Sequence, residues 1–137
     1  MKTAHLDDIP PTDVGGGNLW KPIRSTLGIR AFGVNAHVAR EPGAAIIHEH
    51  DETEAGAGAQ RHEELYVVLR GRATFIVDGE DVDAPAGTLV FVDDPSARRA
   101  AAALEEGTIV LAIGGPVGEA YEVPPWEAWF LEKRNRD

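Results

Sequence analysis

Two pairs of alternating polar residues are able to bind a metal ion. The first pair is His48 and His50, and the second is His62 and Glu64. Because side chains two residues apart in a β-strand point to the same face, each pair presents its donors together. If the two strands pair, up to three imidazoles and one carboxylate converge. Such donors suit Fe, Ni, Zn or Mn, and two histidines with one carboxylate form a known ferrous-iron arrangement. These four residues predict a site for a divalent transition metal.

The other polar residues of this region form less specific patterns. His37 and Glu54 are outlying candidates for metal ligands, although His37 is more typical of an ordinary strand histidine. An acidic cluster consists of Glu49, Asp51, Glu52 and Glu54. Runs of charge usually face water, so this cluster predicts a solvated loop.

Short β-rich runs between glycines and prolines must position these groups. The 15 glycines and nine prolines are spread along the chain as turn signals, which is typical of an all-β sandwich or barrel. The expected strands cover residues 29–40, 44–50, 64–69, 73–77, 82–84, 88–92 and 108–113. Asp78-Gly79 predicts a hairpin between two of them. Residues 51–61 predict a loop, and residues 100–104 are ambiguous.

Three segments are expected. Residues 1–28 form an N-terminal arm, residues 29–115 form a β domain, and residues 116–137 form a C-terminal extension with a short helix. Pro124-Pro125 predicts the start of the helix, because proline is favoured in a first helical turn. Trp126, Trp129 and Phe130 are three and four residues apart and share one helix face. We expect Trp126 and Trp129 to clamp the helix to the domain.

Composition limits the class of protein and its partners. The 137 residues are 43% hydrophobic and 26% charged, which predicts one globular domain. No apolar run approaches the roughly 20 residues that cross a bilayer, and the N-terminus does not resemble a signal peptide. The absence of cysteine fits a cytoplasmic protein. A net charge of −10 disfavours nucleic acid and anionic membranes, which leaves a small molecule or a protein as partner, and we expect a small-molecule ligand.

One strand is apolar on both faces, which predicts a covering partner. In the run Glu64 to Leu69, residues 65, 67 and 69 are apolar, and so are residues 66 and 68. An antiparallel strand with one wet face should alternate between apolar and polar residues. The second face is therefore covered by the N-terminal arm, the C-terminal helix or a second subunit, and we expect a homodimer.

Two motifs in order resemble those of the cupin superfamily. The first comprises Gly43, then His48-Glu49-His50, then Glu64 with Gly71 after six further residues. The second, Gly79 to Gly87, has a glycine, five residues, a proline, one residue and a glycine. The resemblance covers residues 34–113. It implies an all-β fold, a single antiparallel double-stranded β-helix (the cupin or jelly-roll barrel), which is usually dimeric and holds a ligand or metal in its mouth.

The second motif departs from the pattern of metal-binding cupins, in which it supplies a further histidine. Here the corresponding turn presents Arg98, and no histidine follows His62. Arg98 at the mouth of the barrel could pair with Glu64 or hold a carboxylate ligand, because guanidinium binds carboxylates in bidentate fashion. Tyr66 is a second candidate for substrate binding, although an aromatic residue in a strand is more often core.

Three functions are compatible with this pattern. One is a metal-dependent dioxygenase or isomerase, with the metal held by His48, His50 and Glu64 and with His62 as a further ligand. Another is a metal-free cupin that binds a ligand through Arg98. The third is a metal-free isomerase with a histidine as general base. Metal analysis separates the first from the other two, and the sequence identifies no substrate.

Overall fold

Two antiparallel sheets form the molecule in the computed structural model, which describes residues 1–53 and 60–136. The larger sheet has the strand order β1 (Thr12–Asp13), β2 (Asn18–Pro22), β3 (Gly33–Ala39), β10 (Ile109–Gly115), β5 (Glu63–Arg70) and β8 (Leu89–Val92). The smaller has the order β4 (Ile47–His50), β9 (Arg99–Ala103), β6 (Arg72–Val77) and β7 (Glu80–Pro85). The helical elements are η1 (Leu6–Asp8), α1 (Arg24–Leu27) and α2 (Pro125–Arg136).

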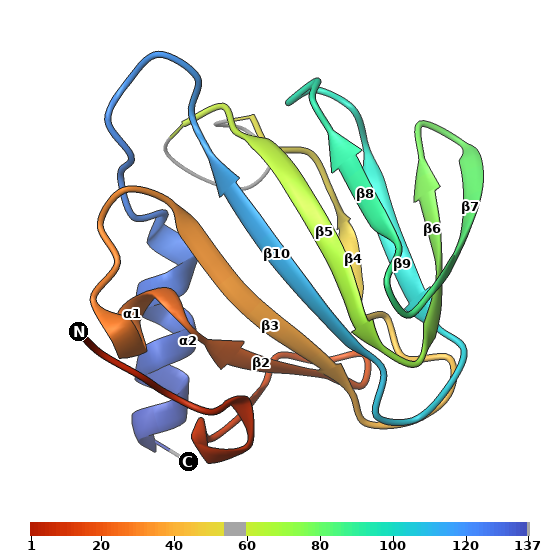
Figure 1. Cartoon of the computed structure of the whole chain (residues 1–137), viewed down its shortest axis with the longest axis horizontal. Coiled ribbons are helices and arrows are strands. Elements are labelled where there is room, and N and C mark those ends of the chain that lie inside the picture. Colours follow the sequence, from red (N-terminus) through yellow and green to blue (C-terminus); the bar gives the residue numbers. More distant parts are fainter. Residues whose placement is uncertain (54–59, 137) are drawn as a thin grey trace.

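The two sheets face each other as in a jelly-roll barrel, and a short helix follows near the C-terminus (Figure 1), which confirms the predicted fold. The ambiguous residues 100–104 lie mostly in strand β9, which pairs with both β4 and β6. The expected hairpin joins β6 to β7. Its turn residues Asp78 and Gly79 have φ angles of 47° and 82°, which are the left-handed values that this turn type requires.

The N-terminal segment continues the larger sheet. Strand β2 pairs with β3, so that Trp20 lies opposite His37, and β1 pairs with β2. This pairing places Asn18 and Trp20 beside the barrel interior, next to the predicted metal-binding region. Residues 1–28 therefore contribute side chains to the interior as well as leading into the barrel.

The core follows the alternation of the strands. Tyr66 and Val68 of β5 point inward and are at most 1% exposed, and they pack in one cluster with Phe75 and Val110. The alternate residues of β5 point outward. This side of the larger sheet exposes Phe91 at 55% and other large apolar side chains, including Leu89 and Phe32. Within the described chain no element covers this outer face, so a second subunit remains the predicted cover.

Helix α2 is anchored by aromatic packing and a buried ion pair. Trp126 and Phe130 pack edge-on against the buried Trp20, with ring centroids 6.0 and 5.2 Å away. Arg24 Nη2 lies 2.8 Å from Glu127 Oε2, and Arg24 Nε donates to both carboxylate oxygens. The helix therefore lies against β2 at one end of the barrel (Figure 1). No described helix is both long and apolar enough to span a bilayer.

The Arg24–Glu127 pair is testable by substitution. Replacing Glu127 with Gln leaves the Arg24 guanidinium buried without a counter-charge, which should lower the free energy of unfolding by about 3 kcal/mol. Denaturation in urea measures this change. The matched control is Glu132→Gln, because Glu132 forms an exposed pair with Arg136 in the same helix, at 3.9 Å. The control should change stability by less than about 0.5 kcal/mol, and equal effects of both substitutions would contradict the anchoring role.

The predicted homodimer is testable at the outer face. A charge at Phe91 or Leu89 would be buried without a partner in a dimer formed through this face. We expect the wild-type chain to be dimeric and Phe91→Asp to be monomeric, with unchanged far-ultraviolet circular dichroism. Sedimentation equilibrium measures the mass. A monomeric wild-type chain, or a variant that stays dimeric, is the contrary result.

Candidate functional site

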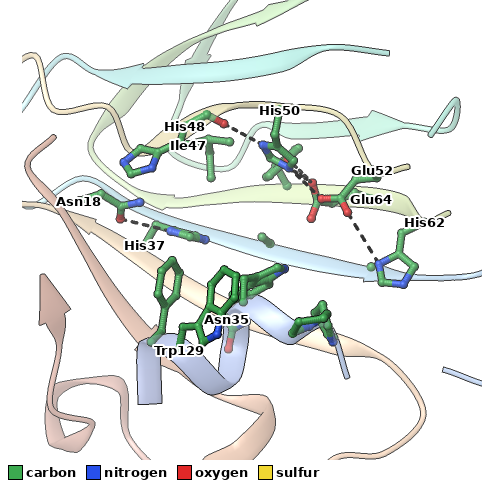
Figure 2. A pocket seen from close by; sticks show the side chains of 18 of the residues that line it. Asn18, Asn35, His37, Ile47, His48, His50, Glu52, His62, Glu64 and Trp129 are labelled. Atoms are coloured by element: carbon green, nitrogen blue, oxygen red, sulfur yellow. Dashed lines mark hydrogen bonds and ion pairs between the residues drawn. The ribbon is translucent and has the colours of Figure 1, made fainter. Parts of the chain in front are cut away.

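A cavity of about 510 Å³ opens between the two sheets and helix α2. One part of its lining is polar and comes from β2 to β5, including His50, Glu52 and Glu64. The other part is aromatic and comes from the segment that leads into α2 and from α2 itself, including Tyr121 and Trp129. Figure 2 shows α2 with Trp129 across the cavity from the group of His50 and the two glutamates.

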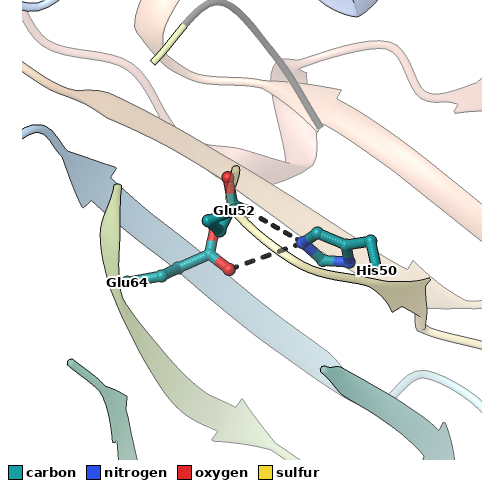
Figure 3. A group of neighbouring side chains, drawn as sticks. All are labelled: His50, Glu52 and Glu64. Carbon is teal, nitrogen blue, oxygen red and sulfur yellow. Dashed lines mark hydrogen bonds and ion pairs between the residues drawn. The ribbon is translucent and has the colours of Figure 1, made fainter. Parts of the chain in front are cut away.

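Three side chains converge at the polar end (Figure 3). His50 Nε2 lies 2.8 Å from Glu52 Oε1 and 3.8 Å from Glu64 Oε1. The candidate ligand atoms of these residues all lie within 4.8 Å of one another. His50 ends β4, Glu52 follows it, and Glu64 lies in β5 of the other sheet, so the cluster bridges the two sheets.

The hydrogen bonds of His50 define which of its nitrogens faces the carboxylates. Nδ1 lies 2.7 Å from the carbonyl oxygen of His48, so Nδ1 carries a hydrogen and donates it. In the neutral ring the lone pair is therefore on Nε2, which faces two carboxylates. Three acceptor groups in this arrangement repel one another unless a cation lies between them, either a proton on Nε2 or a metal ion.

Glu64 is the most strongly bound member of the cluster. The hydroxyl of the buried Tyr66 donates to Glu64 Oε1, and Arg99 Nη1 lies 3.3 Å from the same oxygen. Arg99 is 0% exposed, and its other groups donate to backbone carbonyls of residues 94 and 97. This guanidinium is a permanent cation behind Glu64.

The pKa values in the cluster follow from burial and hydrogen bonding. Burial alone would lower the pKa of His50, but its bonds to Glu52 and Glu64 outweigh burial and raise that pKa to about 10. Burial and the Glu64 charge raise the pKa of Glu52 to about 7. Burial also acts to raise the pKa of Glu64, yet bonds from His50 and Tyr66 hold it below its usual value. Without a metal ion, protons therefore occupy this region at neutral pH.

His62 lies beside the cluster without joining it. Its Nδ1 lies 3.8 Å from the second oxygen of Glu52, and its ring faces that of Tyr121 at 5.6 Å. Nε2 is buried and has no hydrogen-bond partner among the described residues. Burial lowers the pKa of His62. His62 is thus placed to orient Glu52 or to bind a ligand in the cavity.

His48 lies away from the cluster, although the sequence predicted that it would lie next to His50. The pairing of β4 with β9 shifts register between Ile47 and His50, so the strict alternation of faces does not hold. The His48 ring lines another part of the cavity, and its Nε2 donates to the carbonyl oxygen of Gly15 at 3.1 Å. The expected convergence of His48, His50, His62 and Glu64 is therefore partial, because only His50 and Glu64 share the cluster.

Glu52 is the residue that sequence reasoning missed. It was expected in a solvated loop, but it is 8% exposed. Its backbone N–H donates to the carbonyl of Pro95, and its own carbonyl accepts from the N–H of His62. A local signal was the two-residue spacing from His50 to Glu52, which lies beyond the register shift. Glu54, the other outlying candidate in this loop, lies outside the described residues.

The arginine beside Glu64 is Arg99 rather than Arg98. Strand β9 begins at Arg99, which points inward and lies opposite His50. Arg98 points outward, is exposed, and lies 3.4 Å from Glu49 and 3.8 Å from Asp51. Arg98 does not line the cavity within the described chain, so its position does not support a role in holding a carboxylate ligand. Tyr66 does line the cavity, as part of its buried wall.

A neutral polar wall lies on β2 and β3. His37 Nδ1 lies 3.2 Å from Asn18 Oδ1, which can only accept, so Nδ1 donates. Burial lowers the pKa of His37 to about 4, and the ring is therefore uncharged at neutral pH. The carbonyl oxygen of the Asn35 side chain accepts from the N–H of Ile23. His37 thus belongs to this wall and lies outside the cluster of His50, Glu52 and Glu64.

Solved structures with the same architecture are numerous, whereas no family model and no curated protein matches the chain. KdgF from a Halomonas species matches with a TM-score of 0.67 and 15% identity, over 90% of this chain and 96% of its own. A sugar phosphate isomerase of the cupin superfamily from Silicibacter pomeroyi has a TM-score of 0.64 and 17% identity, over 82% and 74%. An RmlC-like cupin from Shewanella frigidimarina has a TM-score of 0.60 and 20% identity, over 87% and 94%. The chain therefore has the cupin fold that its two motifs indicated.

Proposed function

We propose that this protein binds a small organic molecule in its cavity at a divalent transition-metal ion held by His50, Glu52 and Glu64. The observation that carries the proposal is the convergence of three acceptor groups within 4.8 Å at the polar end of a 510 Å³ cavity. Cavities of this size suit small ligands. The Silicibacter isomerase and other cupins of similar architecture are named for small-molecule chemistry, which agrees with this proposal.

The donor atoms fit a metal ion in distance and chemistry. Ligand atoms about 2.0–2.2 Å from a metal lie about 3–3.5 Å from one another, and the His50 Nε2 contacts of 2.8 and 3.8 Å bracket that range. The bond from Nδ1 to a backbone carbonyl orients the lone pair of Nε2, as is usual for ligating histidines. Two carboxylates and one imidazole form an oxygen-rich set, which favours Mn, Fe or Zn over Ni.

The surrounding residues prepare the site. Arg99 and Tyr66 both bond to Glu64 and keep its carboxylate ionised and oriented. His62 lies next to the second oxygen of Glu52 and restricts its rotation. A bound metal would act as a Lewis acid that polarises an oxygen of the ligand. Such polarisation would support isomerisation, whereas dioxygenation would require a redox-active metal such as Fe that binds O₂, and we propose an isomerase or dioxygenase on this basis.

One observation favours a second candidate, a metal-free isomerase or binding protein. The cluster balances its own charge, because the two carboxylates face the Arg99 guanidinium and a protonated His50. In that case His50 and Glu52 would exchange a proton with the ligand. The hypothesis of a metal-free cupin that holds its ligand through Arg98 receives no such support, because the Arg98 side chain lies outside the cavity.

Metal analysis of untagged protein tests the proposal. The protein is exposed to Mn²⁺, Fe²⁺, Zn²⁺ or Ni²⁺, and the excess metal is removed. We expect inductively coupled plasma mass spectrometry to find one ion per wild-type chain. His50→Ala removes the only nitrogen ligand of the cluster and should weaken affinity by more than about 100-fold. His48→Ala is the matched control, since His48 lies outside the cluster, and it should retain the ion.

Two outcomes would count against this assignment. Wild-type protein that retains no ion, while a ligand still binds in the cavity, would favour the metal-free candidate. Equal loss of metal in His48→Ala and His50→Ala would instead support the ligand set expected from the sequence motif alone.

A further inference from the structure

Away from the cluster of His50, Glu52 and Glu64, the cavity offers no cationic side chain to a ligand. No lysine or arginine lines it within residues 1–53 and 60–136, and the intervening residues 54–59 read Glu-Ala-Gly-Ala-Gly-Ala. The guanidinium of Arg99, behind the cluster, is 0% exposed and bonds to Glu64 and to backbone carbonyls. A phosphate or carboxylate group of a ligand that lay away from the cluster would be buried without a counter-charge, which is costly.

The wall on β2 and β3 offers neutral hydrogen-bonding groups instead. Because His37 donates from Nδ1 to Asn18, its Nε2 is left as an acceptor. Because Asn35 accepts through its oxygen, its amide nitrogen is left as a donor. His37 and Asn35 are two residues apart in β3 and both line the cavity. An acceptor and a donor side by side match hydroxyl groups, which both donate and accept.

The opposite wall offers an aromatic surface. Trp129 lines the cavity and is 68% exposed, whereas Trp126 and Phe130 of the same helix pack against Trp20. The clamp predicted for Trp126 and Trp129 thus involves Trp126, and Trp129 is left with its ring accessible. Figure 2 shows Trp129 on α2, across from the polar cluster. An accessible indole at a cavity is suited to stacking on the face of a ring-shaped ligand.

We propose that the ligand of this cavity is an uncharged polyhydroxylated ring, a neutral sugar-like compound, that stacks on Trp129 and bonds to His37 and Asn35 through its hydroxyl groups. This inference rests on the proposed function only in that the cavity binds a small molecule. One oxygen of the ring compound would point to the cluster of His50, Glu52 and Glu64. The remainder of the ring would contact only neutral groups, so anionic derivatives are disfavoured.

Matched pairs of probes test the inference. Neutral hexoses and pentoses, as methyl glycosides, are compared with the corresponding uronic acids and sugar phosphates by isothermal titration calorimetry on the full chain. At least one neutral compound should bind, and its anionic counterpart should bind at least about tenfold more weakly. Binding of an anionic member equal to or tighter than that of its neutral counterpart overturns the proposal, as does failure of every neutral compound to bind.

Variants then locate the contacts. Trp129→Ala should weaken binding of the neutral compound by about three- to tenfold through loss of stacking. Phe91→Ala removes another exposed aromatic side chain, from the outer sheet face, and should have no effect. His37→Ala should weaken binding at an unchanged melting temperature. Should that variant unfold, Trp129→Ala and its control still decide the outcome, and unchanged affinity in Trp129→Ala contradicts the proposal.

Metal content separates this inference from the proposed function. Trp129→Ala and His37→Ala should retain the same amount of metal as the wild-type chain, because neither residue belongs to the cluster. If the chain holds metal but binds the anionic compounds more tightly, the proposed ligand class is wrong and the metal assignment still stands. A chain that binds the neutral ring without any metal overturns the metal assignment alone.

Discussion

The buried carboxylate of Glu64 is the constraint on which the arrangement of the site depends. An ionised carboxylate inside a barrel is costly unless donors surround it. Here the donors come from three directions, namely Tyr66 on the same strand, Arg99 on β9 and His50 on β4. Because β5 belongs to the larger sheet and β4 and β9 to the smaller, these contacts join the two sheets at the polar end of the cavity. Loss of Glu64 would therefore leave the buried Arg99 guanidinium without a counter-charge and remove contacts between the sheets where the site lies.

Because Arg99 partly neutralises the charge of Glu64, a second acid can be buried nearby. Arg99 offsets much of the Glu64 charge from behind, so Glu52 approaches a partly neutralised neighbour. His50 lies between the two acids, and its Nδ1 bond to the carbonyl of His48 keeps Nε2 directed at them. The result is a position that requires one positive charge, and either a proton or a metal ion can supply it. This choice connects the metal-dependent and metal-free functions, which use the same side chains and differ in the cation that they share.

Much of the fold could be predicted from the sequence, because strand alternation and turn chemistry are local. The Asp78-Gly79 hairpin and the two faces of β5 follow from residue order alone. The site was less predictable, because it depends on single-residue shifts between strands. A register shift in β4 separates His48 from His50, and one residue decides that Arg99 rather than Arg98 enters the barrel. Glu52 was assigned to solvent because its neighbours are acidic, although backbone bonds to Pro95 and His62 hold it inside. Such long-range pairings have no signature in a local pattern.

The parts of the chain outside the barrel motifs have the largest influence on what the cavity can accept. The cluster belongs to the barrel, but Asn18 comes from β2 and Trp129 from α2, near opposite ends of the chain. These elements are held together by the pair of Arg24 and Glu127 and by Trp20 of β2, which packs against the helix. Asn18 and Trp129 lie outside the cluster and outside the core between the sheets. One fold can host many reactions, because the chemistry depends on the side chains that line the site. For the proposed ligand class, the terminal segments supply Trp129 and the Asn18 side chain that orients His37, whereas the barrel strand β3 supplies His37 and Asn35 themselves.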